Sequence, residues 1–344
     1  MHAADGTPGQ VTIQTIATQA GVSVATVSKV LNGRPDVAAG TRTRIEQILA
    51  RHQYRRRARR SGSAAGPDLI DLVFHDFGSP WSMEIVRGVE RTAGEAGVGV
   101  VLSDLGGRRR PQQDWIDKVL NRPLRGVILL MSSLDSEHRD QLIRRGIPLV
   151  VVDTDGATPD DVPMVGSNNW FGGLLATRHL AQLGHRRIGM ITGPNDALCS
   201  LARVDGWRGA HSEGALPIPE DLIRYGNFTV ESGYRLGREL LCLAERPTAI
   251  FAGSDMQALG VFRAAREAGL DVPRDLSVVG YDDLPLSEWV APGLTTVHQP
   301  LMQMASTATR IVLDARGPGE SWPPRLELPT HLVVRESTAP PTSA

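Results

Sequence analysis

Two groups of residues have types and spacings that could do chemistry. One is a basic N-terminal group suited to a polyanion, and the other is a set of polar residues that follow apolar runs. Residues 1–66 hold ten Lys/Arg against three Asp/Glu, whereas the rest of the chain holds 27 Lys/Arg against 35 Asp/Glu. A small basic head on a larger acidic body predicts that the head contacts nucleic acid and that the body does something else.

The N-terminal segment 13–32 has the pattern of a helix-turn-helix. Four apolar residues are spaced to pack two short helices together: Ile16, Ala20, Val27 and Val30. Gly21 suits the positive φ of a tight turn between helices, and Ser23 is placed to cap the second helix. That helix would enter the major groove and bring four side chains near base edges: Val24, Ala25, Thr26 and Lys29. A third helix at about 39–51 completes the core, and a three-helix module with no DNA function is the alternative.

From residue 69 onward, apolar runs alternate with amphipathic segments. The expected strands are 69–74, 98–103, 126–131, 148–153, 188–192, 249–252 and 277–281, with helices such as 83–96, 171–183, 233–243 and 257–268 between them. Apolar strands followed by helices predict parallel sheets covered on both faces, and this length favours two doubly wound lobes. Ligands of such sheets bind beyond the carboxyl ends of the strands.

Several polar and aromatic residues stand at those strand ends. Asp76 and Trp81 follow the first strand, and Trp81 beside a proline suits stacking on a sugar ring, or else covers the sheet as a core residue. Asp153 and Asp282 end two other strands and could accept hydrogen bonds from vicinal hydroxyls, although Asp153 could instead cap the next helix.

Composition and motifs exclude several classes of protein. With 41% hydrophobic and 22% charged residues and no apolar run long enough to cross a bilayer, we expect no membrane segment, and the N-terminus does not resemble a signal peptide. The two cysteines, Cys199 and Cys242, form no CxxC pair, which argues against a zinc site or a disulfide framework. The expected compartment is therefore a reducing cytoplasm. Phosphate-loop, dinucleotide, GxSxG and HExxH motifs are absent, so we expect no catalytic residues, no metal and no cofactor.

The chain resembles the LacI/GalR family of bacterial repressors. The resemblance rests on Ala-Gly-Val-Ser-Val-Ala-Thr-Val-Ser at 20–28 and on five segments of the body: Gly184-His-Arg-Arg-Ile188, Arg203-Val-Asp-Gly206-Trp207, 254–260, 278–283 and 294–299. It implies an all-α helix-turn-helix headpiece followed by two doubly wound parallel α/β lobes of the type I periplasmic-binding-protein kind. It also implies a homodimer on pseudo-palindromic operator DNA, controlled by a small effector between the lobes.

The resemblance also implies site residues. With the residues chosen above, the expected DNA-binding set is Thr12, Ile13, Ser23, Val24, Ala25, Thr26, Ser28, Lys29, Asn32, Thr41, Tyr54, Arg56, Arg57 and Arg60. Arg203, Phe228, Asp282 and Gln299 match effector-contacting positions, and Ser254 stands where the family commonly has asparagine. The expected effector set is Asp76, Trp81, Asp153, Arg203, Phe228, Ser254, Asp282 and Gln299.

The segment after the headpiece departs from the family pattern. Family hinges read Tyr-x-Pro-Asn and later supply a leucine to the minor groove, but here Arg56 and Arg57 replace the proline and asparagine, and Ser63 stands at the leucine position. Serine cannot act as an apolar wedge between base steps, whereas arginines contact phosphates or a narrow minor groove.

We therefore expect operator affinity to fall steeply with salt, because each neutralised phosphate releases counterions. The measurement is the slope of the logarithm of affinity against the logarithm of salt concentration. A slope that corresponds to only one or two phosphate contacts would contradict the expectation.

The expected organisation is a polar tail (1–10), a headpiece (11–53), an arginine-rich linker (54–67), a two-lobed body (68–335) and a flexible tail (336–344). Within the body, lobe 1 comprises residues 68–167 and 299–335, and lobe 2 comprises residues 168–298.

The expected function is repression of a carbohydrate uptake or catabolic operon, relieved by a sugar-like effector. The alternatives are a corepressor-dependent or activating regulator that senses a non-sugar metabolite, and a solute-binding protein.

Overall fold

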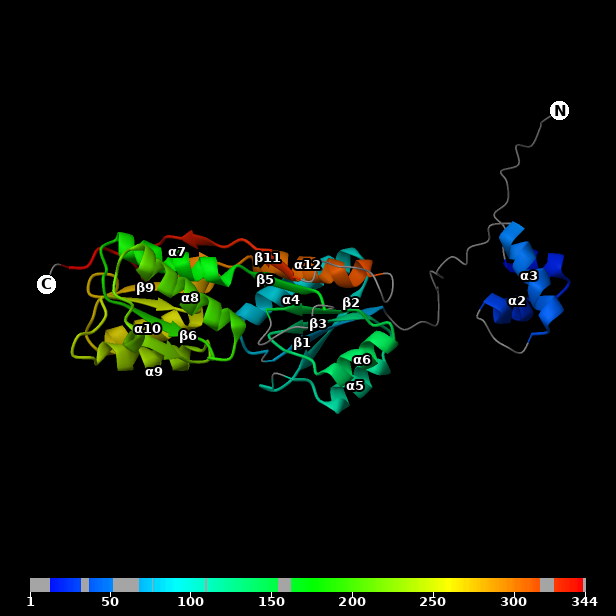
Figure 1. Cartoon of the computed structure of the whole chain (residues 1–344), viewed down its shortest axis with the longest axis horizontal. Coiled ribbons are helices and arrows are strands. Elements are labelled where there is room, and N and C mark those ends of the chain that lie inside the picture. The colour runs from blue at the N-terminus through cyan, green and yellow to red at the C-terminus, as the bar shows by residue number, and fades with distance from the viewer. Residues whose placement is uncertain are drawn as a thin grey trace, which may run out of the picture. The chain divides into compact units, whose positions relative to one another are not determined.

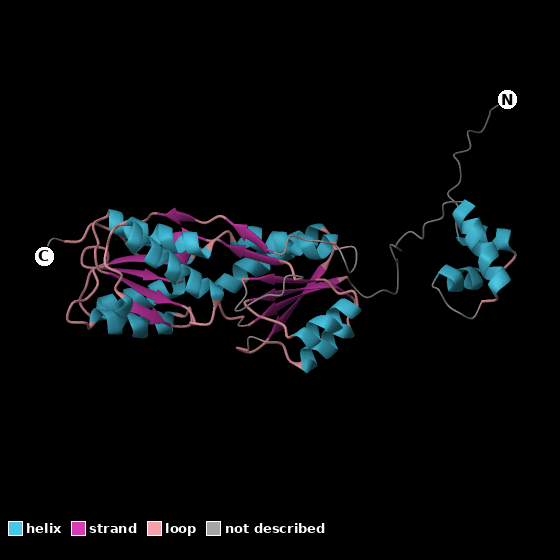
Figure 2. Ribbon diagram, in the orientation of Figure 1, coloured by secondary structure: helices cyan, strands magenta, loops and turns pink. Residues whose placement is uncertain are grey.

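The computed structural model describes residues 13–31, 37–51, 68–75, 77–108, 110–153, 162–315 and 325–342. The chain forms two compact units, Met1–Ala65 and Gly66–Ala344. The described residues of the first unit form helices only, and Figures 1 and 2 show alternating helices and strands in the second unit. None of the described helices is long and apolar enough to cross a membrane.

The first unit is a small helical module. It consists of α1 (Ile13–Ala20), α2 (Val24–Leu31) and α3 (Ala39–Arg51). Its buried core contains the four residues chosen from the sequence together with Ala17 and Ile45. Gly21 has φ +64°, as the turn between α1 and α2 requires. The Ser23 hydroxyl accepts a hydrogen bond from the Thr26 amide at 3.2 Å, which confirms its predicted role as the cap of α2.

Lobe 1 of the second unit is a parallel sheet with the strand order β11-β5-β4-β3-β1-β2. Its strands are β1 (Leu69–Phe74), β2 (Gly99–Asp104), β3 (Leu124–Leu130), β4 (Leu149–Val152), β5 (Met164–Ser167) and β11 (Arg325–Leu328). One face packs on α4 (Pro80–Glu95) and α12 (Leu301–Asp314), and the other packs on α5 (Gln113–Leu120) and α6 (Ser136–Arg144).

Lobe 2 repeats this plan with the strand order β12-β10-β9-β8-β6-β7. Its strands are β6 (Ile188–Thr192), β7 (Ile223–Tyr225), β8 (Ala249–Ala252), β9 (Ser277–Asp282), β10 (Thr295–His298) and β12 (His331–Val333). Its helices are α7 (Asn169–Gln182), α8 (Leu198–Glu213), α9 (Val230–Leu241), α10 (Asp255–Glu267) and α11 (Leu286–Trp289), with a 3-10 turn at Glu220–Leu222. α7 and α8 cover one face and α9 and α10 the other. The predicted fold class, a helical headpiece before two parallel-sheet lobes, is confirmed.

The C-terminal segment differs from the expectation of a lobe 1 segment followed by a flexible tail. β12 pairs antiparallel with β10 of lobe 2. Beyond it, the Ser337 hydroxyl accepts from the Thr295 amide at 2.8 Å, and the Ser277 hydroxyl donates to the Ala339 carbonyl at 3.0 Å. Because these groups are buried, hydrogen bonds fix the segment to the sheet.

His185 is part of the same contact. Only 2% of His185 is exposed, and its Nε2 lies 2.9 Å from the Ala339 carbonyl oxygen. Its Nδ1 lies 2.8 Å from the Thr248 hydroxyl. Burial lowers the pKa of His185 and of the neighbouring His179, which lies 3.0 Å from the Thr338 hydroxyl.

We expect removal of residues 336–344 to destabilise the protein. Thr295 and Ser277 would lose buried hydrogen bonds, and each unpartnered buried group costs about 1–3 kcal/mol. Urea unfolding of the truncated chain and of Ser337→Ala measures this effect. An unfolding midpoint unchanged by the truncation would show that the segment adds nothing to stability.

A second buried feature of lobe 1 is Asp71 in the middle of β1. The residue is fully buried, and neither carboxylate oxygen has a hydrogen-bond partner among the described residues. The Arg122 guanidinium lies 3.8 Å from Oδ2. Burial raises the pKa of Asp71 despite this charge.

We therefore expect Asp71→Asn to stabilise the protein at pH 7. A carboxyl whose folded-state pKa lies above its unfolded value costs stability when it is ionised, by about 1.4 kcal/mol per pKa unit. The gain should shrink as the pH falls toward 4, since the wild-type carboxyl then becomes protonated. Thermal unfolding at pH 7 and pH 4 tests this, with the exposed Asp114→Asn as a control. A gain in melting temperature that is independent of pH would contradict the assignment.

Candidate functional site

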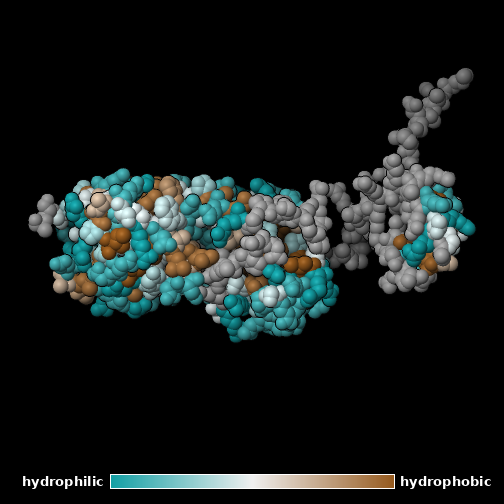
Figure 3. Space-filling view, in the orientation of Figure 1, coloured by the Kyte–Doolittle hydropathy of each residue, from teal (hydrophilic) through white to brown (hydrophobic). Residues whose placement is uncertain are grey.

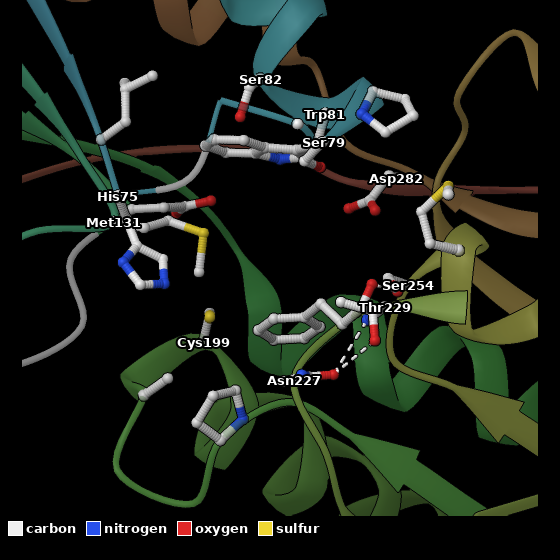
Figure 4. Close-up of a pocket in the computed structure, with 18 of the residues that line it drawn as sticks. His75, Ser79, Trp81, Ser82, Met131, Cys199, Asn227, Thr229, Ser254 and Asp282 are labelled. Atoms are coloured by element: carbon white, nitrogen blue, oxygen red, sulfur yellow. Dashed lines mark hydrogen bonds between the residues drawn. The ribbon is translucent and has the colours of Figure 1, made fainter. Parts of the chain in front are cut away.

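A cavity of about 550 Å³ lies between the two lobes, beyond the carboxyl ends of both sheets. Lobe 1 contributes the residues that follow β1, β3 and β4, and lobe 2 contributes those that follow β6, β7, β8 and β9. Figure 4 shows the labelled side chains surrounding the cavity, with Trp81 and Ser79 on one side and Cys199 and Asn227 on the other.

A hydrogen-bonded chain joins lobe 1 to the crossing segment that leads from β10 to α12. The Gln299 Nε2 donates to Asp153 Oδ2 at 2.6 Å, and Trp81 Nε1 donates to Gln299 Oε1 at 3.3 Å. Gln299 is 1% exposed and does not line the cavity itself. It fixes two residues that do, and Asp153 is bonded in this way rather than serving as a helix cap.

The position of Trp81 is compatible with both roles that the sequence left open, covering the sheet and contacting a ligand. Its ring is half-buried, packs against the core of lobe 1 and also lines the cavity. Pro80 begins α4 directly after this loop, and its fixed φ suits the first turn of a helix. The indole is therefore held in place with one part accessible to a ligand.

Arg203 lies at the base of the cavity and is 4% exposed. Its Nε donates to Asn169 Oδ1 at 2.8 Å, and its Nη1 donates to the Gly253 carbonyl. The guanidinium carbon sits 3.6 Å from the centre of the Tyr281 ring and 5.4 Å from that of Phe228. These contacts hold the guanidinium in one orientation, which favours recognition of a shaped ligand over general attraction of anions.

Four residues that line the cavity have backbone conformations that residues other than glycine rarely adopt. The φ angles are +44° at Met131, +45° at Asp153, +63° at Phe228 and +114° at Asp282. Such strain persists only where surrounding structure maintains it, and it concentrates at functional sites. Here the four residues end or follow the strands β3, β4, β7 and β9.

Two of the cavity carboxyls, those of Asp153 and Asp282, are unusual acids. Burial raises the pKa of Asp153 and raises that of Asp282 well above its ordinary value, while the positive charge of Arg203 opposes both shifts. The charges of Asp255 and Asp153 raise the pKa of Asp282 further. A ligand that donates hydrogen bonds to these carboxylates would replace the hydration that burial removes.

Ser254 and the neighbouring Asp255 have different roles. The Ser254 hydroxyl caps α10 by accepting from the Gln257 amide at 3.1 Å, and it donates to the Phe228 carbonyl at 3.1 Å. Asp255 is fully buried instead and accepts from the Leu284 amide and the Ser287 hydroxyl, each at 2.8 Å. These hydrogen bonds hold the loop after β9. Burial raises the pKa of Asp255 to about 7.

The structure thus brings most of the predicted effector residues together. Six line the cavity: Trp81, Asp153, Arg203, Phe228, Ser254 and Asp282. Gln299 lies behind them, and Asp76 falls outside the described residues. Sequence reasoning missed His75, which directly follows β1 and lines the cavity. The rule that selected Asp153 and Asp282 at strand ends would also have selected His75.

The structure describes only some of the predicted DNA-binding residues. Ser23, the cap of α2, and Lys29 on α2 are exposed, whereas Val24, Thr26 and Thr41 are half-buried. Thr12, Asn32, Tyr54, Arg56, Arg57 and Arg60 lie outside the described residues, as do the side chains of Ile13, Ala25 and Ser28.

Two protein-family models match parts of this chain. Residues 12–57 match the model of bacterial regulatory proteins of the lacI family, and residues 177–338 match a periplasmic binding protein-like domain. The chain is 33% identical over 330 residues to the HTH-type transcriptional repressor PurR of Escherichia fergusonii, which covers 95% of this chain and 97% of that protein.

Solved structures agree. The transcriptional regulator CelR in complex with cellobiose is 32% identical with a TM-score of 0.71, covering 95% of this chain and 100% of that one. The lac repressor dimer bound to operator and the anti-inducer ONPF is 27% identical with a TM-score of 0.67, covering 96% and 100%. This chain therefore belongs to the lacI family of bacterial regulatory proteins and is a DNA-binding transcriptional regulator.

Proposed function

We propose that the protein is a homodimeric repressor of a carbohydrate uptake or catabolic operon and acts in the cytoplasm. It leaves a pseudo-palindromic operator when a small sugar-like effector binds between the lobes. The observation that supports this most strongly is the grouping of Arg203, Asp153 and Asp282 beside the aromatic rings of Trp81 and Phe228. Fixed hydrogen-bonding groups combined with flat apolar faces suit a ring that has hydroxyls on its edge and C–H groups on its faces.

The origin of the lining residues supports a coupling between binding and lobe movement. Trp81 and Asp153 belong to lobe 1, whereas Arg203, Phe228 and Asp282 belong to lobe 2. A ligand that contacts both sets is bound best when the lobes are close together, so it shifts the population toward the closed form. If the operator is bound best by the other form, ligand and operator weaken each other by the same factor.

Within this proposal the exposed side of α2 reads the operator. Ser23 and Lys29 are exposed there, with Val24 and Thr26 half-buried beside them. The basic residues of the first 66 positions contribute the electrostatic part of the affinity. The remaining members of the predicted set are proposed on sequence alone.

The test uses the full chain and an operator selected from random DNA duplexes. Binding is followed by fluorescence anisotropy, with and without a panel of monosaccharides, disaccharides, purines and aromatic acids. We expect a sugar to release the operator. A purine or aromatic acid that strengthens operator binding would favour a corepressor-dependent regulator instead, and release by no sugar would refute the proposal.

A further inference from the structure

The order of strands in lobe 1 separates two kinds of binding group along one edge of the cavity. β4, β3 and β1 are neighbours in the sheet, and the residues that follow them are Asp153, Met131 and His75. Neighbouring strands lie about 4.8 Å apart, so the ends of β4 and β1 are separated by about 10 Å. A carboxylate, a thioether and an imidazole therefore follow one another along this edge.

Three charged groups of the cavity form one cluster. Asp153 and Asp282 both act on Arg203, and Gln299 is bonded to Asp153. Figure 4 shows His75 and Met131 on the side of the cavity opposite Asp282 and Ser254, with the Trp81 ring between the two sides. The chain neighbours of His75 and Met131, Phe74 and Leu130, also line the cavity.

His75 has an unusual environment for a polar side chain. Its Nδ1 is buried and has no hydrogen-bond partner among the described residues. Nδ1 has no accessible surface, so a ligand in the cavity can bond only to the other ring nitrogen of His75, Nε2.

We propose that the effector has two unlike parts: a hydroxylated ring held by Asp153, Arg203 and Asp282, and a flat apolar ring with one hydrogen-bonding group that reaches His75. This chemistry is that of a glycoside with an aromatic aglycone. The inference rests on the proposed function, because it names the chemical class of the ligand of the same cavity. The cavity of about 550 Å³ falls within the range of sites that hold ligands larger than one sugar ring.

A disaccharide is the obvious competing ligand, and the lining argues against it. A second sugar ring would bring several hydroxyls to the side where Met131 lies beside His75, and His75 offers a ligand one ring nitrogen, Nε2. A flat ring covers thioether and aromatic surface and needs only one hydrogen bond there.

The experiment compares matched probes on the full chain by isothermal titration. The probes are the methyl and p-nitrophenyl β-D-glucosides, galactosides and xylosides, with cellobiose as the disaccharide. For the sugar that binds, we expect the p-nitrophenyl glycoside to bind at least tenfold more tightly than its methyl counterpart. Equal affinities, or tighter binding of cellobiose than of the p-nitrophenyl glycoside, would overturn the inference.

Variants of His75 sharpen the result. His75→Leu should reduce the preference for the nitrophenyl ring about tenfold and leave methyl glycoside affinity unchanged, since only the aglycone reaches this residue. His75→Gln, which keeps a hydrogen-bonding group, should restore part of the preference. The exposed Arg186→Ala, in a separate pocket of lobe 2, is the control and should change neither affinity. An unchanged preference in His75→Leu would overturn the role of His75.

The results distinguish a failure of the proposed function from a failure of the aglycone inference. If methyl glycosides or cellobiose bind and release the operator while the nitrophenyl ring adds nothing, the sugar-responsive function stands and the aglycone inference is wrong. If no glycoside binds and none releases the operator, both are wrong.

Discussion

Arg203→Ala should abolish the response to effector while leaving operator affinity unchanged. Among the described residues that line the cavity, Arg203 is the only Lys or Arg, and its charge acts on both Asp153 and Asp282. Asn169, Gly253 and Tyr281 hold its orientation. Its removal takes away a charge-assisted ligand contact and brings Asp153 and Asp282 into direct repulsion. We expect effector affinity to fall at least 100-fold.

The measurements are effector binding by isothermal titration and operator binding by anisotropy. Arg203→Lys is the matched variant, because it keeps the charge but loses the fork that grips Asn169 and Gly253. It should bind effector more weakly than wild type and more tightly than Arg203→Ala. Loss of operator binding together with effector binding in Arg203→Ala would show that the residue mainly maintains the fold of lobe 2.

Gly206→Ala should destabilise the body more than any surface substitution. Gly206 lies where α8 crosses α7, and a Cβ added there would overlap the Trp170 carbonyl oxygen and lie 2.7 Å from the Leu174 nitrogen. Both atoms belong to the backbone, so a side-chain rotation cannot relieve the overlap. The helices would have to separate, at a cost of about 3 kcal/mol or more, by analogy with other overpacked cores.

Gly94→Ala is the matched control for this substitution. Gly94 also lies in a helix, α4, but the nearest atom to an added Cβ is a flexible Glu90 carboxylate oxygen at 3.8 Å. Since alanine favours helix over glycine by about 1 kcal/mol, this variant should be as stable as wild type or more so. The measurement is the free energy of unfolding of both variants in urea. Similar values for Gly206→Ala and Gly94→Ala would mean that α7 and α8 are not packed as closely as described.

Much of the fold could be predicted because long apolar strands and strongly amphipathic helices have clear sequence patterns. β1, β6 and β8 occupy the expected residues. The strands that sequence reasoning missed are three or four residues long, and three of them, β7, β11 and β12, lie at sheet edges. So few residues do not establish an alternating or continuous apolar pattern.

The sequence analysis did not predict α8, because the residues that this helix buries are not all apolar. Its sequence places a charged residue, Arg203, and a glycine, Gly206, on the buried side, while Leu201 is 36% exposed. This inverts the usual apolar pattern of a helix. The inversion follows from the position of α8, which is packed against α7 through glycines and directs Arg203 into the cavity.

The site was predicted in part for a similarly physical reason. Strand-end positions pointed to Trp81, Asp153 and Asp282 because the topology of parallel sheets makes those positions converge. Nothing in the sequence indicates that Gln299 supports Asp153 from behind, or that Asp255 holds the loop after β9. Those contacts join residues far apart in the chain and depend on the folded structure.

The central claim is that a ligand bound between the lobes controls the affinity for DNA, and its most direct test is reciprocity. Using the glycoside from the probe panel that binds most tightly, one measures its dissociation constant for the free protein and for the protein bound to its operator. The account predicts weaker binding to the operator complex, by the same factor by which the glycoside weakens operator binding. Equal dissociation constants in the two states would contradict it.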